Sequence, residues 1–438
     1  MSAQFFISLL VIAVSLPTIQ LTCAYLIMLE RKVAAYVQDR YGPNRTNFSF
    51  GLNDIWKMVG LGWLFDAKNK MLGLGQALAD GLKLLVKEDY TPPHVEKGLF
   101  YLAPMLVVVP ALLGAAVIPW GGVWEFPGIG SEGNWWVEPG LSFVTVFPTD
   151  LGVIFLLAIS SLGVYGVVLG AYASNNKYSF LGGLRATAQM LSYEIPLAIA
   201  VLVMIITFQT ASTTEMTLLQ ADGAWGIFAH PLLAIIFFTC GLAECNRAPF
   251  DLAEAEQELV GGFHTEYSSL KWALFFLAEY MHMITSCAFF ALLFLGGGDL
   301  LPFVNLIPQV NDGTFFGLFA EGSLIGGVLL VGMQATIYAV KVIFLLWLMM
   351  MVRWTLPRFR FDQLMKLAWR GMIPLTLLML LVVTIMVALG VTQWWAFLLM
   401  NFAAYFGSRY LAKLMPADPP VNRRIALEGS RFSGVAGE

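Results

Sequence analysis

Four glutamates stand inside or beside long apolar stretches of this 438-residue chain. Glu30 closes the first stretch and Glu244 ends a later one, whereas Glu194 and Glu279 lie within two others. An ionised carboxylate at membrane depth costs about 2.5–3.5 kcal/mol on insertion scales, so such residues usually have a function. Their chemistry would be proton exchange along a polar path or cavity. Interhelical salt bridges are the alternative, and Glu244 is spaced to pair with Arg247 on one helical face.

More acids follow in the segment 248–269, which we predict to be an acidic inner loop. They are Asp251, Glu254, Glu256, Glu258 and Glu266. These side chains either continue the proton path or are solvated on the inner side of the membrane. His282 lies three residues after Glu279 and could share a proton with it, although a packed or hydrogen-bonded histidine is the more common role.

Charged and polar side chains also gather directly after the first apolar stretch. They lie in a polar stretch made of Glu30, Arg31, Lys32, Gln38, Arg40, Gly42, Pro43, Asn44 and Arg45, followed by Gln76, Asp80, Lys83, Lys87, Glu88 and Asp89. Acids and bases held at a helix end can line the mouth of a chamber. They can equally anchor the chain at the membrane surface and contact partner proteins.

The composition determines what kind of element must position these groups. Hydrophobic residues make up 58% of the chain and charged residues 12%, about half the roughly 25% of a soluble domain. The chain is therefore predicted to be an all-α polytopic membrane protein forming one integral domain, 1–438. A net charge of −4 argues against nucleic acid as a partner. The four cysteines lie in apolar segments and are predicted to be small buried thiols.

About 20 apolar residues span a bilayer as a helix. Nine windows fit, at 5–29, 99–119, 149–172, 191–210, 229–247, 270–295, 324–350, 371–389 and 391–408. Eight spans are the alternative, because little besides Gly390 divides the last two. The runs are too long for the strands of a membrane barrel and lack their alternation.

The basic residues orient this bundle. Lysine and arginine occur in every second loop between the predicted spans, and none of the 25 lies in the intervening loops 120–148, 211–228 and 296–323. The positive-inside rule then predicts an N-terminus outside and a C-terminus inside, with a basic cytoplasmic tail at 409–438. Residues 46–75 have apolar side chains at helical spacing and predict an amphipathic insertion on the inner side. The loop 120–148, rich in Gly, Pro and Trp, predicts an ordered outer cap.

The usual signatures of redox and nucleotide chemistry are absent from the sequence. There is no Walker loop, no His-Glu-x-x-His, no iron–sulfur cysteine run and no dinucleotide fingerprint. We therefore expect no flavin, iron–sulfur cluster or metal in this chain. The long first apolar stretch runs into charged residues and not into a cleavage site, so no cleavable signal is expected.

Several ordered motifs resemble one known family. They are Glu30-Arg31-Lys32, Gln38-Asp39-Arg40-Tyr41-Gly42-Pro43-Asn44, and the segments 79–84, 174–178, 185–194, 243–256 and 356–363. Together they are similar to the H-type membrane subunit of bacterial NADH:quinone oxidoreductase, a family equivalent to subunit 1 of mitochondrial complex I. The segment between Asn44 and Gln76 is longer than is usual in that family, and Ala77 stands where a proline is common.

The resemblance implies a subunit that joins the membrane arm to the hydrophilic arm and walls the quinone chamber. Residues implied near the quinone tunnel or its mouth are Glu30, Arg31, Arg40, Asp80 and Arg247. Residues implied at the start of a carboxylate-lined proton path are Glu194, Glu244, Glu254, Glu256, Glu258 and Glu279. Quinone would be bound as substrate of this translocase, while NADH, FMN and the iron–sulfur clusters would belong to other subunits.

The implied partners are the other complex I subunits of both arms, quinone and membrane lipids. The implied location is the bacterial inner membrane, with the mitochondrial inner membrane as the less favoured choice. Two alternatives stay open from the sequence. One is the homologous membrane subunit of an energy-converting hydrogenase or ferredoxin-linked complex, and the other is a stand-alone ion-coupled transporter.

Overall fold

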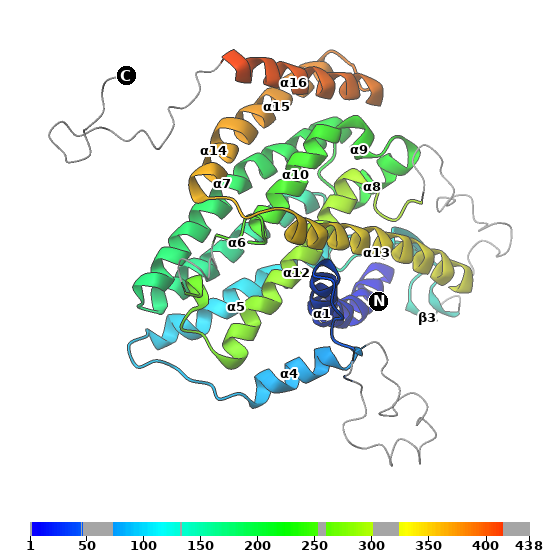
Figure 1. Ribbon diagram of the computed structural model, residues 1–438. Helices are drawn as coiled ribbons and strands as arrows, with labels where there is room; N and C mark the ends of the chain where they lie inside the picture. The colour runs from blue at the N-terminus through cyan, green and yellow to red at the C-terminus, as the bar shows by residue number, and fades with distance from the viewer. Residues whose placement is uncertain are drawn as a thin grey trace, which may run out of the picture.

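The computed structural model describes residues 2–44, 46, 73–131, 134–252, 260–300 and 324–414, most of which are helical (Figure 1). The longer helices are α1 (Ala3–Val37), α5 (Lys97–Gly114), α6 (Gly152–Ala173), α7 (Lys177–Phe208), α12 (Ser269–Phe294), α13 (Leu324–Thr355), α15 (Ile373–Ala388) and α16 (Trp394–Leu414). The shorter ones are α4 (Gln76–Val86), α8 (Thr213–Asp222), α9 (Gly226–Ala229), α10 (Pro231–Glu244) and α14 (Phe361–Lys366). Two 3₁₀ turns, η2 (Ala115–Val117) and η3 (Gly262–His264), and a π-helical segment, η4 (Leu367–Met372), complete the helical elements of this part.

Seven helices in the described ranges are long and apolar enough to cross a membrane. They are α1, α5 continued by η2, α6, α7, α12, α13, and the continuous helix of α14, η4 and α15. The prediction of an all-α polytopic membrane protein is therefore confirmed. The other two predicted windows, 229–247 and 391–408, hold α10, which has only 14 residues, and α16. The number of spans and the sidedness stay predictions.

Helix α12 runs through the middle of the bundle, between α5 and α13 (Figure 1). Most of its apolar window is buried, a larger share than in any other of the seven apolar helices. Helix association in a bilayer depends on van der Waals packing, because lipid is as apolar as the side chains. The ring of Phe237 on α10 accordingly packs against Phe289 and Phe294 of α12, with ring centroids 5.4 and 5.6 Å apart. Polar residues of α12 are thereby placed inside the protein and away from lipid.

A close approach between α5 and α6 supports this arrangement. A Cβ atom added at Gly166 of α6 would lie 2.3 Å from the side chain of Val107 and 3.0 Å from the backbone oxygen of Ala103. The two helices can approach this closely only because residue 166 lacks a side chain. One turn further along α6, Gly170 leaves room for Phe275 of α12 and Tyr267.

The segment 120–148 forms two small antiparallel sheets. Strand β1 (Val123–Phe126) pairs with β4 (Gly140–Phe143), and β2 (Ile129–Ser131) pairs with β3 (Asn134–Val137). The Gln4 side chain of α1 donates to the Phe143 carbonyl over 3.1 Å and accepts from the Phe143 amide over 2.8 Å, which ties the first pair to the bundle. These strands lie in the predicted outer loop, whose position on the outer side of the membrane stays a prediction.

The predicted insertion at 46–75 and the basic tail at 409–438 lie mostly outside the described residues. Within the described part, α4 follows the insertion and contacts α1 and α12 while keeping every side chain at least partly exposed. The four cysteines, all described, are free and buried, as predicted.

Candidate functional site

Glu30 is the centre of a cluster built from three helices and one loop. It lies near the end of α1, and 7% of its surface is exposed. The Tyr280 hydroxyl of α12 donates to Oε2 of Glu30, and Nη1 of Arg353 on α13 donates to Oε1. Nη1 of Arg247 lies 3.4 Å from both carboxylate oxygens. A buried carboxylate with this many donors can stay ionised, because its charge is paired and hydrogen-bonded.

Arg247 is the residue that connects Glu30 to a second acid. Its Nη2 atom lies 3.8 Å from Oε2 of Glu279, and its guanidinium carbon stands 4.3 Å from the centre of the Tyr280 ring. Only 7% of the Arg247 side chain is exposed. The guanidinium therefore compensates two carboxylates from different helices inside a low-dielectric region, where charges interact strongly.

The local backbone explains why Arg247 contacts these acids. Helix α10 ends at Glu244, and the following Asn246 adopts a left-handed conformation with φ of 49°. Asparagine is one of the few residues that visit this conformation readily. The turn breaks the helical spacing on which a pairing of Glu244 with Arg247 depended. In the structure, Arg247 contacts Glu30 and Glu279, and Glu244 instead faces His282.

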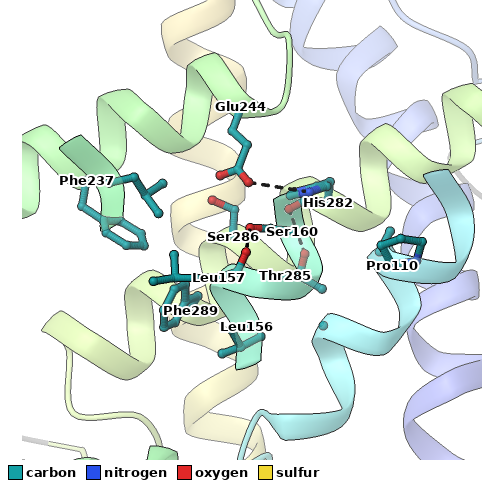
Figure 2. A pocket seen from close by; sticks show the side chains of 13 residues that line it. Pro110, Leu156, Leu157, Ser160, Phe237, Glu244, His282, Thr285, Ser286 and Phe289 are labelled. Carbon is teal, nitrogen blue, oxygen red and sulfur yellow. Dashed lines mark hydrogen bonds and ion pairs between the residues drawn. The ribbon is translucent and has the colours of Figure 1, made fainter. Parts of the chain in front are cut away.

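Two small cavities lie beside Glu244. The smaller, about 20 Å³, is bordered by Glu279, Glu244 and His282 together with apolar side chains and Asn246. The larger, about 30 Å³, is bordered by Glu244, His282 and hydroxyl-bearing residues of α6 and α12 (Figure 2). A cavity of about 10–15 Å³ suffices for one water molecule. Both cavities therefore have room for water next to a carboxylate.

Glu194 approaches the same region from α7. Ser161 of α6 lies close to its carboxylate, and Glu194 is close enough to Glu244 for the two charges to interact. Within the described ranges, neither Glu194 nor Glu244 has a lysine or arginine within 4.0 Å of its carboxylate. These two acids differ from Glu30 and Glu279, which are paired with arginine.

A surface pair stands at the end of α1 that leads into the first polar segment. Nη1 of Arg31 lies 2.6 Å from Oδ2 of Asp80 on α4, with 49% and 25% of the two side chains exposed. Asp80 also accepts from the Gln76 amide over 2.9 Å. The pair holds α4 against α1 close to the buried cluster. Arg40, in the turn after α1, is exposed.

Comparison with known proteins places these residues in a family. The profile of the NADH dehydrogenase family matches residues 9–384. The chain belongs to this family. It is 40% identical over 369 residues to an H-type chain of NADH-quinone oxidoreductase from Geobacter metallireducens, an alignment covering 84% of this chain and 92% of that protein. The resemblance drawn from the motifs is therefore confirmed.

Other curated relatives are similar over comparable lengths. The H-type chain of NADH-quinone oxidoreductase from Leptospira biflexa is 41% identical over 357 residues, covering 80% of this chain and 86% of that protein. The corresponding protein of Cytophaga hutchinsonii is 37% identical over 382 residues, covering 86% and 96%. The alignments thus cover nearly the whole length of these family members.

The structure brings together some of the site residues that were predicted from the sequence. Glu30, Arg247 and Glu279 form one cluster, Arg31 pairs with Asp80, and Glu244 and Glu194 lie near one another. Glu254, Glu256 and Glu258 lie in 253–259, outside the described residues.

Three residues of the site were not among those predicted. Tyr280 and Arg353 both bind Glu30, and Nη2 of Arg358 lies 2.6 Å from Oδ2 of Asp251. Arg353 was visible in the sequence only as a positive charge after an apolar window, and Arg358 lay in the motif 356–363 without an assigned role. Tyr280 had a stronger signal, because it directly follows the intramembrane acid Glu279.

Proposed function

We propose that this chain is the membrane subunit of a proton-translocating NADH–quinone oxidoreductase, where it forms part of the quinone chamber and the start of the proton path. The names of the relatives supply the substrate and the assembly. NADH oxidation, FMN and the iron–sulfur clusters are assigned to partner subunits of the hydrophilic arm. The other membrane-arm subunits receive the protons. The bacterial inner membrane is the proposed location.

The observation that carries the proposal is the position of Arg247 between Glu30 and Glu279. Glu30 and Arg247 are among the residues assigned to the quinone chamber, together with Arg31, Arg40 and Asp80. Glu279 is assigned to the proton path. The Arg247 guanidinium lies 3.4 Å from Glu30 and 3.8 Å from Glu279. A change of charge in the quinone chamber therefore changes the electrostatic potential at Glu279.

The chemistry of quinone supplies that event. Reduction to quinol consumes two electrons and two protons, so negative charge develops next to the chamber wall before protons arrive. Arg247 and Arg353 would be drawn toward that charge, and their hold on Glu30 and Glu279 would weaken. A carboxylate that loses its cation in a low-dielectric setting takes up a proton. Proton uptake at Glu279 would then follow each quinone reduction.

The path continues through acids without a nearby arginine or lysine in the described structure. Glu244 borders water-sized cavities, and Glu194 lies close to Ser161 and Glu244, which suits groups that load and release protons. Ionisable residues kept inside a membrane commonly mark such relays. Glu254, Glu256 and Glu258 complete the proposed path from the loop after α10.

Replacement of Glu279 by Gln in the assembled enzyme tests this proposal. Glutamine keeps the size of the side chain and cannot carry the proton, so we expect NADH-dependent proton pumping to be suppressed while the complex still assembles. Glu138→Gln, at an exposed position after β3, is the matched control and should pump normally. Full proton pumping by an assembled Glu279→Gln enzyme would contradict the proposal.

A further inference from the structure

His282 of α12 stands between the two cavities and borders both of them. Glu244 is the only other acidic or basic side chain described that borders both. On one side the walls include Glu279, and on the other they include hydroxyl groups. Figure 2 shows the His282 ring and the Glu244 carboxylate turned toward each other at the larger cavity. The imidazole is thus the one described ring that borders both spaces.

The two nitrogens of this ring have different surroundings. Nε2 lies 3.9 Å from Oε1 of Glu244, which is too long for a direct hydrogen bond. A small movement of either side chain, or one bridging water, would connect the two atoms. Nδ1 is buried and has no hydrogen-bond partner among the described residues. A buried polar atom without a partner costs about 1–3 kcal/mol, and such atoms are normally satisfied by ordered water. Both nitrogens therefore have reason to bind water.

The hydroxyl groups of the larger cavity can also bind water, as hydrogen-bond acceptors. The Ser160 hydroxyl donates to the Leu157 carbonyl over 3.0 Å, and the Thr285 hydroxyl donates to the His282 carbonyl over 3.0 Å. Each hydroxyl hydrogen is thereby used within its own helix, which leaves oxygen lone pairs as acceptors. Volumes of about 20 and 30 Å³ hold one or two water molecules each.

We propose that His282 is a proton-transfer residue that connects Glu279 with Glu244 through water held in these two cavities. The inference rests on the proposed proton path and adds to it one residue and one hydration site. A histidine used only for packing would have its ring nitrogens satisfied by fixed partners, as in His230. There, Nε2 lies 3.0 Å from the Thr207 hydroxyl and Nδ1 lies 3.1 Å from the Asn401 amide.

The transfer is balanced in protons and charge. A proton leaves the Glu279 carboxylic acid and reaches Nδ1 of His282 through water in the smaller cavity. The proton on Nε2 then passes to Oε1 of Glu244, directly or through one water. Glu279 ends as a carboxylate, Glu244 ends as a carboxylic acid, and His282 ends neutral in its other tautomer. The first tautomer is restored when water removes the proton from Nδ1 and gives one to Nε2.

Chemical rescue of His282→Ala in the assembled enzyme tests the assignment. A positioned acid–base group contributes roughly 10²–10⁴-fold to proton transfer. We therefore expect the rate of proton translocation to fall by at least about tenfold. Added imidazole should restore most of it. Pyrazole has the same ring size and is not a base at neutral pH, so it should not. The exposed His94→Ala variant should respond to neither compound.

The outcomes separate this inference from the proposed function. Normal pumping by His282→Ala, or equal rescue by imidazole and pyrazole, would overturn the role of His282 as a proton carrier. If the alanine variant does not assemble, His282→Gln keeps a polar side chain of similar size, and full pumping by that variant would overturn the role as well. If Glu279→Gln loses pumping and the His282 variants do not, only the inference fails. If Glu279→Gln also pumps fully, the proposed path itself fails.

Discussion

The guanidinium of Arg247 lies 3.8 Å from the carboxylate of Glu279, although Arg247 lies in the loop after α10 and Glu279 lies in α12. The same guanidinium contacts Glu30 at 3.4 Å and covers the Tyr280 ring. A single buried cation therefore stabilises two acids and an aromatic ring. This arrangement makes the cluster cooperative, because the loss of one member leaves its partners uncompensated.

Replacement of Arg247 by Met tests that cooperativity. Removing one partner of a buried ion pair typically costs about 3–5 kcal/mol. In this variant Glu279 and Glu30 stay buried after losing the Arg247 guanidinium, although Arg353 still binds Glu30. We expect the assembled complex to have a lower Tm and to lose most of its NADH–quinone activity. Arg247→Lys keeps the charge and cannot reach two carboxylates with one planar group, so an intermediate loss is expected. A normal Tm and normal turnover in Arg247→Met would contradict the role of the cluster.

The hydroxyl of Tyr280 offers a finer test. Tyr280→Phe removes a donor to the charged Glu30, a kind of bond worth about 1.5–3 kcal/mol. We expect a weaker apparent affinity for quinone, measured as a raised KM. Tyr338→Phe is the matched control, because it removes a hydroxyl bonded over 2.7 Å to the Ala288 carbonyl, away from the acids. Tyr338→Phe should lower Tm only, and a raised KM in both variants would argue for a general structural effect.

The sequence predicted the helical architecture well and the site only in part. Apolar windows identify α1, α7 and α12 because a run of about 20 apolar residues rarely forms anything other than a membrane-spanning helix. Contacts between Glu30 and Arg353 join positions 323 residues apart, and no local pattern predicts such a partner. The pairing expected for Glu244 and Arg247 was wrong because it assumed a helix that continues beyond Glu244.

Other differences have equally local causes. Helix α10 is shorter than its apolar window, since the chain turns at Cys245 and Asn246. The strands in 120–148 form around anchoring contacts such as Gln4 with Phe143, which lie 139 residues apart. The cavities beside Glu244 arise where α6, α10 and α12 meet, so no single segment contains their walls.

The close approach of α5 and α6 predicts a strong effect of side-chain size. In Gly166→Val the new side chain meets Val107 and the α5 backbone, so we expect a destabilisation of about 1–3 kcal/mol. The yield of assembled complex and its Tm should both fall. Gly98→Ala, on α5 with open space around it, should leave Tm unchanged or slightly raised. Equal effects of the two substitutions would contradict the packing described for this interface.

The predicted sidedness can be measured with introduced cysteines. The four native cysteines are buried, so they should react slowly and give a low background. Glu138→Cys, in the outer cap, should react with a membrane-impermeant maleimide in intact cells. Arg409→Cys, at the start of the basic tail, should react only after the membrane is opened. Labelling in the reverse order would contradict the orientation predicted from the basic residues.

Proton transport by the buried acids is tested most directly by the number of protons moved for each NADH oxidised in the assembled enzyme carrying Glu194→Gln. Glu194 approaches Glu244 and lies close to Ser161, and glutamine in its place preserves size but cannot load a proton. We predict a complex of normal composition in which this number falls well below that of the unaltered enzyme. A normal ratio in Glu194→Gln would contradict the claim that these buried acids carry protons in response to quinone reduction.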